Sequence, residues 1–296
     1  MTDTDVLIIG GGPAGMICAV QLKRYGIEPL VFERKRLGGL LWNANLVENY
    51  PGFPGGIPGP ELAGRMIEQF ESQALEACPL EVTGVDYDGR RFLAAAGAET
   101  ISARAVVIAT GTQPNRFPTK LLPPEAESRV FYEVADLAEV RGAAVAVIGA
   151  GDAAFDYALN LANRENRVLI FNRGAEIRSL PLLVARTEAS GRIEYHPNTA
   201  VNAVEAGNQG LRLQMVDGSG EKTYKVDMLL GALGRKAFLP AISQRLAAEQ
   251  ASLTAAGRFH VIGDVHNGIY RQTAIAVGDG LRAAMIIYQF LKEQST

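Results

Sequence analysis

A chain of 296 residues in which 48% are hydrophobic and 21% are charged is typical of a globular protein with about two domains. No apolar run reaches the roughly 18 residues of a membrane span, and the N-terminal M-T-D-T-D is acidic where a secretory signal is basic. We therefore expect a cytoplasmic protein with no membrane partner. The net charge of −3 and the scattered basic residues argue against nucleic acid as a partner. The two cysteines, Cys18 and Cys78, form no C-x-x-C, which argues against a disulfide framework or a metal site.

The first predicted element is a buried parallel strand over 6–9, followed by a turn and a helix over 16–22. The turn contains three glycines in G-x-G-x-x-G spacing, Gly10, Gly12 and Gly15. The first glycine permits a tight turn, the second lets the backbone approach a pyrophosphate, and the third lets the helix pack against the strand. A second strand over 29–32 ends in Glu33, which can bind a ribose roughly 20 residues beyond the glycines. This order favours a dinucleotide site over the alternative of a structural turn.

The next predicted strand, V-V-I-A-T-G-T over 106–112, ends in a small Thr-Gly turn that can pack against the same dinucleotide. Close to the C-terminus, F-H-V-I-G-D-V over 259–265 is another buried strand. Its Asp264 can bind the ribityl hydroxyls of a flavin. The segment over 270–284 begins a helix whose N-terminus can face the flavin ring and stabilise negative charge on it.

A second glycine turn follows a predicted strand over 145–148, with Gly149 and Gly151 in the turn and Ala154 at the third small position. A helix over 155–162 and a strand over 168–171 complete the unit. The strand ends in N-R-G-A-E-I-R instead of an acid. Because arginine accommodates a 2′-phosphate, Arg173 and Arg178 favour NADP over NAD, the alternative being that they are solvated surface charges.

Together these pieces resemble the low-molecular-weight thioredoxin reductase family of flavoproteins along essentially the whole chain. They include G-G-G-P-A-G, L-G-G-L-L-W-N-A-N-L-V-E-N-Y-P-G-F-P, I-A-T-G, the second G-A-G, G-D-V and Y-R-Q-T-A-I-A-V-G-D-G. The resemblance implies an α/β fold with two doubly wound, Rossmann-like dinucleotide-binding domains. It places a discontinuous FAD-binding domain at 1–115 and 235–296 and an NAD(P)H-binding domain at 116–234.

The resemblance also implies which residues bind each cofactor. For FAD they are Gly10, Gly12, Pro13, Ala14, Gly15, Glu33, Arg34, Gly39, Leu40, Asn49, Ala109, Thr110, Gly111, Gly263, Asp264, Arg271, Gln272 and Thr273. For NADPH they are Gly149, Gly151, Asp152, Ala153, Asn172, Arg173 and Arg178. In the family's H-R-R-x-x-x-R signature for the 2′-phosphate, the first position is Asn172 here and the third is Gly174. We therefore expect a softened preference for NADPH.

Thioredoxin reductases carry a redox-active C-x-x-C ahead of the second glycine turn. In this chain the corresponding residues are Tyr132-Glu133-Val134-Ala135, which cannot exchange disulfides. Cys18 lies on the predicted helix after the first turn, and Cys78 precedes a strand, so we interpret both as structural. Thioredoxin reductase activity is therefore not expected, and no catalytic residue is assigned.

Relatives without the dithiol include the thioredoxin-reductase-like ferredoxin/flavodoxin–NADP reductases, which V-F-Y-E-V-A-D-L and G-A-G-D-A-A-F-D-Y-A-L-N-L resemble. Those enzymes usually have a tail that covers the flavin ring, whereas this sequence ends in Y-Q-F-L-K-E-Q-S-T, so a more open ring or another acceptor is expected. Another relative reduces low-molecular-weight disulfides with a cysteine in the first glycine turn, where this chain has Ala14.

We expect an FAD-dependent oxidoreductase that moves electrons between NADPH and ferredoxin or flavodoxin, as a homodimer. The alternatives are an NAD(P)H reductase of quinones or disulfides, and a non-enzymatic flavin-binding protein with a vestigial nicotinamide site. By analogy with the family, the segments P-T-K-L-L-P-P and G-R-K-A-F-L-P are expected to serve as hinges.

Overall fold

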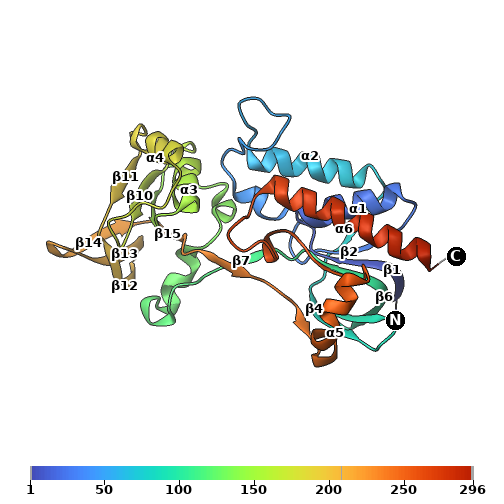
Figure 1. Ribbon diagram of the computed structural model, residues 1–296. Helices are drawn as coiled ribbons and strands as arrows, with labels where there is room; N and C mark the ends of the chain where they lie inside the picture. Colours follow the sequence, from blue (N-terminus) through green and yellow to red (C-terminus); the bar gives the residue numbers. More distant parts are fainter. Residues whose placement is uncertain (1, 208, 295–296) are drawn as a thin grey trace. The chain divides into compact units, whose positions relative to one another are not determined.

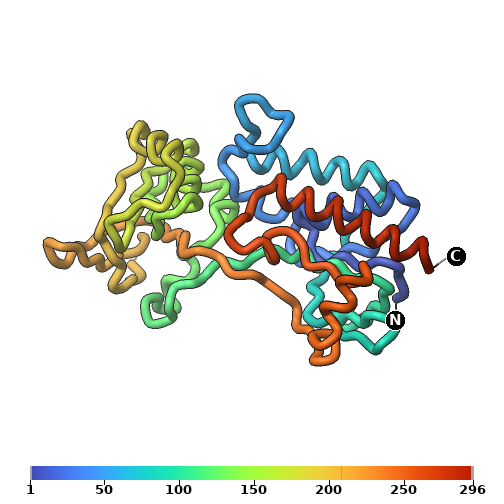
Figure 2. The backbone as a smooth tube through the Cα atoms, in the orientation of Figure 1, coloured from blue at the N-terminus to red at the C-terminus, as the bar shows by residue number. Residues whose placement is uncertain are grey.

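The computed structural model describes residues 2–207 and 209–294, and the chain divides into two compact units. Unit 1 comprises Met1–Trp42, Val47–Gln113 and Ala237–Thr296, and unit 2 comprises Asn43–Leu46 and Pro114–Lys236. The first and last segments that the structure describes belong to unit 1, and Figure 2 draws them in blue and red. The chain leaves unit 1 at β7 (Thr112–Pro114) and returns at β16 (Arg235–Ala237), and these two strands pair with each other.

Unit 1 is built on an eight-stranded sheet. In spatial order its strands are β17 (Ala241–Ile242), β4 (Val82–Tyr87), β5 (Phe92–Ala96), β6 (Glu99–Ile108), β1 (Thr2–Ile9), β2 (Leu30–Phe32) and β3 (Ala77–Cys78), with β18 (Phe259–Val261) also paired to β6. The strands β3, β2, β1, β6 and β18 are parallel, whereas β5 is antiparallel to β4 and β6. Leu7 of β1 faces Leu30 on one side and Val106 on the other.

The helices of unit 1 are α1 (Pro13–Arg24), α2 (Gly59–Glu71), α5 (Gln244–Ala255) and α6 (Thr273–Glu293), with 3₁₀ turns η1 (Gly39–Asn43) and η5 (Gly263–Val265). Helix α1 contacts β1, α5 contacts β4 and β18, and α2 and α6 pack on α1 (Figure 1). Helix α1 starts with Pro13, whose fixed φ suits the first helical position. Helices α1 and α6 lie side by side, as Figure 1 shows.

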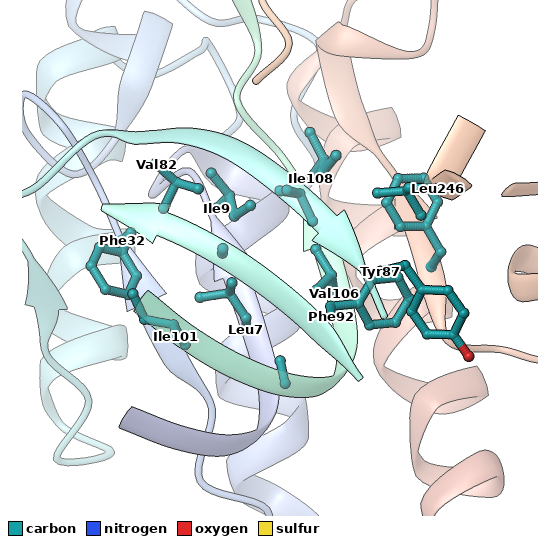
Figure 3. Packing of buried hydrophobic residues seen from close by; sticks show 14 of the residues in the cluster. Leu7, Ile9, Phe32, Val82, Tyr87, Phe92, Ile101, Val106, Ile108 and Leu246 are labelled. Atoms are coloured by element: carbon teal, nitrogen blue, oxygen red, sulfur yellow. The ribbon is translucent and has the colours of Figure 1, made fainter. Parts of the chain in front are cut away.

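Alternating side chains of the strands fill the core of unit 1. Figure 3 shows Leu7 and Ile9 between the side chains of neighbouring strands, while Phe92 and Tyr87 lie toward Leu246 of α5. Phe92 is fully buried and its ring stacks on that of Phe259, 5.9 Å between centroids. Burying a large side chain of this kind contributes roughly 1.5–3 kcal/mol to folding, so these rings fix the sheet whose strand ends form the first glycine turn.

Unit 2 contains a five-stranded sheet and a three-stranded one. In spatial order the first is β11 (Ile193–His196), β10 (Arg167–Phe171), β9 (Ala144–Ile148), β15 (Met228–Gly231) and β8 (Val130–Phe131), and all neighbours are parallel. The second is an antiparallel meander of β12 (Ala200–Gly207), β13 (Gly210–Asp217) and β14 (Gly220–Val226). The helical segments are α3 (Asp152–Ala162), α4 (Pro181–Glu188), η2 (Thr119–Leu121), η3 (Pro124–Arg129) and η4 (Val134–Leu137).

The strand order of unit 2 is that of a doubly wound sheet. From β9 the chain passes through α3 to β10 on one side, while β15 pairs on the other side of β9. The predicted α/β fold with a Rossmann-like, doubly wound sheet is therefore confirmed for unit 2. Helices α1 and α3 begin earlier than predicted. They start directly after the second glycine of each turn, at Pro13 and Asp152.

Two predicted strands are shorter than expected. Strand β6 ends at Ile108 and β7 begins at Thr112, so the segment expected to be one strand over 106–112 is interrupted by a loop. Strand β18 ends at Val261, and the G-D-V that follows is the 3₁₀ turn η5. In both cases a glycine at positive φ, Gly111 or Gly263, turns the chain out of the sheet.

One helix of the described chain, α6, is long and apolar enough by length and composition to cross a membrane. One of its faces is buried, through Ala276, Gly280, Ala283, Ala284, Ile287 and Leu291. This face packs along α1, whereas Ile275, Met285 and Ile286 of the same helix are exposed, and only 33% of its most apolar 18-residue window is buried.

The contact between α1 and α6 generates a stability prediction. A Cβ at Gly280 would lie 2.3 Å from the backbone oxygen of Ala14 and 2.5 Å from Ile17, whereas a Cβ at Gly278 meets nothing within 4 Å. Overpacking of this kind costs roughly 1–3 kcal/mol, so Gly280→Ala should lower the free energy of unfolding by that amount. Gly278→Ala, on the exposed side of the same helix, should raise it by about 0.5–1 kcal/mol. Urea unfolding followed by circular dichroism measures both, and equal midpoints for the two variants would contradict this packing.

Candidate functional site

The first glycine turn joins β1 to α1 in unit 1. Gly10 has φ +112°, and a Cβ there would lie 2.3 Å from the backbone oxygen of Ala109. A Cβ at Gly15 would lie 1.9 Å from the backbone oxygen of Gly10. These two positions need glycine because the end of β1, the loop after β6 and the first turn of α1 are in direct contact.

Gly12 has a different environment. Any residue can adopt its φ of −76°, and a Cβ there would meet nothing within 4 Å. It is the N-cap of α1, and as a glycine it has no side chain that could cap the N–H groups of that helix end. By contrast, the N-terminus of α5 is capped by the Ser243 hydroxyl, which accepts from the Leu246 N–H. An open surface above Gly12 beside uncapped N–H groups fits a pyrophosphate.

Glu33 closes the turn from the end of β2. Its Oε2 accepts a hydrogen bond from the Gly11 N–H at 2.7 Å, and its Oε1 accepts from the Lys35 N–H at 2.9 Å. The carboxylate is thus held in place beside the glycines, as binding a ribose requires.

A small cleft of about 40 Å³ opens beside Glu33. Its lining includes Glu81 and Phe238, which are not among the residues expected to bind FAD. The Arg34 guanidinium lies 3.8 Å from the centroid of the Phe238 ring and 3.1 Å from the Glu81 carboxylate. The Thr110 hydroxyl donates to the Phe238 carbonyl. These contacts bring the loop after β2, the loop after β6 and the chain following β16 together.

The C-terminal segment adds η5 and the start of α6 to the same region. Gly263 has φ +71°, and a Cβ there would lie 2.9 Å from Ala14 of α1. Asp279, which the sequence analysis missed although it lies in A-V-G-D-G, accepts from the Gly263 N–H at 3.2 Å and from Asn267 Nδ2 at 2.7 Å. Asn49 Nδ2 donates to Oε1 of Gln272, the N-cap of α6, at 2.8 Å.

Most of the residues expected to hold FAD therefore follow the carboxyl ends of four neighbouring parallel strands, β2, β1, β6 and β18. Gly39 begins η1, and its Cβ position lies 3.2 Å from the Gly12 Cα. The carboxyl edge of such a sheet is where doubly wound folds bind their ligands. The geometry of unit 1 fits one dinucleotide along this edge.

The second glycine turn, in unit 2, has the same design. Gly149 has φ +149°, and a Cβ there would lie 2.4 Å from the backbone oxygen of Ala232. Gly151 is the N-cap of α3 and has no side chain to cap it, and the nearest atom to its Cβ position is the Arg178 oxygen at 3.9 Å. The Arg178 N–H donates to the Ala150 carbonyl at 2.8 Å, so the loop after β10 runs alongside the turn.

The loop over 172–180 is held by two of the predicted binding residues. Asn172 is buried, its Nδ2 donates to the Glu176 carbonyl and the Tyr195 hydroxyl, and its Oδ1 accepts from Gly174. Asp152 accepts from the Leu180 N–H at 2.8 Å. Both side chains shape the loop, while Arg173 is exposed and Arg178, 80% exposed, pairs with Glu176 at 3.4 Å.

The segment Tyr132-Glu133-Val134-Ala135 is firmly packed in unit 2. The Tyr132 hydroxyl accepts from the Phe117 N–H at 3.2 Å, and the two rings lie 5.8 Å apart. Val134 is buried in the core of the unit. Glu133 Oε1 pairs with the Arg235 guanidinium at 2.9 Å, and its Oε2 accepts from Asn43 Nδ2 at 2.5 Å.

Neither cysteine is placed or tuned for thiol chemistry. Cys18 is fully buried on α1, and burial raises the pKa of its thiol to about 12. Cys78 is half-buried on β3, and burial together with Glu99 and Glu76 raises the pKa of its thiol. A reactive cysteine needs a lowered pKa, so both fit a structural role. Within residues 2–207 and 209–294 no group of three His, Cys, Asp or Glu side chains could hold a metal ion.

Comparison with known proteins gives one consistent relationship. Residues 4–280 match the family model described as pyridine nucleotide-disulphide oxidoreductase. The chain is 32% identical to the thioredoxin reductase of Streptomyces coelicolor, with 97% of this chain and 94% of that protein covered. It is also 32% identical to the bifunctional thioredoxin reductase/thioredoxin of Mycobacterium leprae, but spans only 66% of that longer protein.

A solved structure agrees with these sequence matches. The crystal structure of Lactococcus lactis thioredoxin reductase superposes with a TM-score of 0.83 at 27% identity, covering 98% of this chain and 99% of that one. The thioredoxin reductase family uses FAD and NADPH. The chain therefore belongs to the pyridine nucleotide-disulphide oxidoreductase family and is a thioredoxin reductase-like, FAD-dependent NAD(P)H oxidoreductase.

Proposed function

We propose that this protein moves electrons between NADPH and a protein electron carrier such as ferredoxin or flavodoxin, without a dithiol. The observation that carries the proposal is the segment over 132–135. It contains no cysteine; Tyr132 and Glu133 are hydrogen-bonded within unit 2, and Val134 is buried there. The only cysteines of the chain, Cys18 and Cys78, lie on other elements and have raised thiol pKa values. With no thiolate pair to reduce a disulfide, an acceptor that takes electrons directly from the flavin fits best.

In this proposal unit 1 binds FAD. The uncapped N-terminus of α1 and the open surface of Gly12 would hold the pyrophosphate, and Glu33 would hold the ribose of the adenosine. The N-terminus of α6 would lie by the ring, where its dipole favours negative charge. Bound FAD supplies hydride acceptance and the release of electrons one or two at a time.

Unit 2 would bind NADPH at the turn over 149–151. Because β10 and β15 pair on opposite sides of β9, this turn lies at the switch point of the sheet, where a dinucleotide binds. The exposed Arg173 and Arg178 would bind the 2′-phosphate, while Asn172 and Asp152 hold the loop that presents them. We propose the sequence-based boundaries, 1–115 with 235–296 and 116–234, as the FAD and NADPH domains.

The alternatives differ in what they require. A reductase of quinones or small disulfides would turn over without a protein partner, and a flavin-binding protein with a vestigial nicotinamide site would not react with NADPH. By likeness to thioredoxin reductases we further propose a cytoplasmic homodimer.

Anaerobic stopped flow tests this function. The FAD-loaded protein should lose its oxidised flavin absorbance rapidly with NADPH, and steady-state turnover should rise at least tenfold when ferredoxin or flavodoxin is added. The double variant Cys18→Ala, Cys78→Ala should keep both rates within twofold, because in this proposal no electron passes through either cysteine. Loss of turnover in a folded, FAD-loaded double variant, or turnover with thioredoxin that exceeds that with either carrier, would refute the proposal.

The proposed FAD site predicts that a single substitution can weaken FAD binding without destabilising the apoprotein. Gly12→Ala should weaken FAD binding at least tenfold, since its methyl group would occupy the surface that faces the pyrophosphate, yet leave the apoprotein as stable as before. Gly64→Ala on α2, where a Cβ also meets nothing within 4 Å, is the matched control and should bind FAD normally. Titration of apoprotein with FAD, followed by flavin fluorescence, gives both affinities. Equal affinities for the two variants would place the pyrophosphate elsewhere.

The proposed NADPH site predicts a change in cofactor choice. A charge-assisted contact contributes about 1.5–3 kcal/mol, so Arg178→Ala should lower kcat/KM for NADPH at least tenfold and leave kcat/KM for NADH within twofold. Arg212→Ala, which removes an exposed arginine from β13 of the same unit, should change neither value. A proportional loss with both nucleotides would show that Arg178 does not contact the 2′-phosphate.

A further inference from the structure

The loop over 172–180 in unit 2 contains an acidic residue between the two arginines that we propose bind the 2′-phosphate of NADPH. Arg173 and Arg178 flank Glu176 in the sequence, and all three side chains are exposed. Glu176 Oε2 lies 3.4 Å from Arg178 Nε, whereas Arg173 makes no ion pair within the part of the chain that the structure describes. The two arginines are therefore not equivalent, because only Arg178 already meets a carboxylate.

The backbone that carries this ion pair is held at both of its ends. The Glu176 carbonyl accepts a hydrogen bond from Nδ2 of the buried Asn172 at 2.9 Å. The Arg178 N–H donates to the Ala150 carbonyl at 2.8 Å. Ile177, which lies between Glu176 and Arg178 in the chain, packs against the hydrophobic core of unit 2. These contacts keep the carboxylate and the guanidinium close to each other on the outer side of the loop.

The ion pair also lies beside the second glycine turn. Arg178 forms an isolated parallel bridge with Gly151, the N-cap of α3. In a doubly wound domain, a dinucleotide whose pyrophosphate lies at this helix start has its adenosine ribose near the end of the next strand, here β10. A phosphate group on the 2′-oxygen carries up to two negative charges near neutral pH. It would therefore be attracted by Arg178 and repelled by Glu176 at the same place.

The exposure of the pair limits how strongly Glu176 can oppose a phosphate. The Arg178 and Glu176 side chains are 80% and 78% exposed, so water and salt screen the attraction between them. A phosphate can accept two parallel hydrogen bonds from one guanidinium, which a carboxylate that reaches only Nε does not do here. A 2′-phosphate would thus displace Glu176 with a loss of affinity of a few fold, whereas a nucleotide without this phosphate needs no displacement.

We propose that Glu176 is a specificity-determining residue of the nicotinamide nucleotide site: by occupying the Arg178 guanidinium it lowers the affinity for NADPH and leaves the affinity for NADH unchanged. The inference rests on the proposed function, because it takes Arg178 as the residue that binds the 2′-phosphate. It adds a second cause of a softened preference for NADPH to the one given by Asn172 and Gly174. Glu176 acts through Arg178 and has no part in hydride transfer.

Calorimetric titration of the FAD-loaded protein with adenosine 2′,5′-bisphosphate and with adenosine 5′-phosphate tests this role, since the two ligands differ only in the 2′-phosphate. Glu176→Gln keeps the shape of the side chain and removes its charge. It should bind the bisphosphate at least threefold more tightly than the parent and bind adenosine 5′-phosphate within twofold. Glu221→Gln, which neutralises an exposed carboxylate on β14 of the same unit, is the matched control and should change neither affinity.

The same substitution in an Arg178→Ala background shows whether Glu176 acts through the arginine. There Glu176→Gln should change the affinity for the bisphosphate less than twofold, because no guanidinium is left to release. The inference would be overturned by equal bisphosphate affinities of parent and Glu176→Gln, by an equal gain for adenosine 5′-phosphate or in Glu221→Gln, by a gain that persists without Arg178, or by the absence of bisphosphate binding in every variant.

These titrations involve neither hydride transfer nor an electron carrier. A parent protein that binds the bisphosphate and loses its oxidised flavin absorbance with NADPH, but shows no effect of Glu176→Gln, would refute this inference alone. A protein in which Glu176→Gln tightens bisphosphate binding as expected, but whose flavin is not reduced by NADPH, would refute the proposed function alone.

Discussion

The contact between a glycine turn and the backbone of the neighbouring strand end is the constraint on which both units depend. At Gly10 the neighbouring oxygen belongs to Ala109, and at Gly149 it belongs to Ala232. Each of these alanines directly follows a strand, β6 or β15, that pairs in parallel with the strand entering the turn. The close approach places the first turn of the following helix at the carboxyl edge of the sheet. The N–H groups at the starts of α1 and α3 therefore lie where a phosphate would bind.

These local features could be predicted from the sequence because they depend on residues close together in the chain. Glycine spacing, the apolar runs before it and the acid after β2 all lie within a few turns of one another. The exact starts of α1 and α3 could not be read from apolar periodicity, since Pro13 and Asp152 begin the helices before the first apolar residue that marks the pattern. Hydrophobic pattern reports which face of a helix is buried, whereas the start depends on backbone geometry.

The parts that the sequence did not predict depend on pairing between distant residues. Glu133 meets Asn43 across 90 positions and Arg235 across 102, and nothing in their local sequence marks them as partners. Likewise Asn172 occupies a position expected to face a phosphate, but its amide is used within the loop by Glu176, Tyr195 and Gly174. A polar residue that finds its partners inside the fold has the same sequence signature as one that awaits a ligand.

The segment over 132–135 is held by several contacts of this kind. A dithiol that exchanges electrons must be reachable by its partner, and it needs thiolates. Here the Tyr132 ring packs beside Phe117, both carboxylate oxygens of Glu133 are bonded, and Val134 lies in the core of unit 2. Such a segment cannot leave its place without exposing a buried charge pair and apolar surface, which is costly. These contacts hold the segment inside unit 2 and bond Glu133 to residues 90 and 102 positions away in the chain.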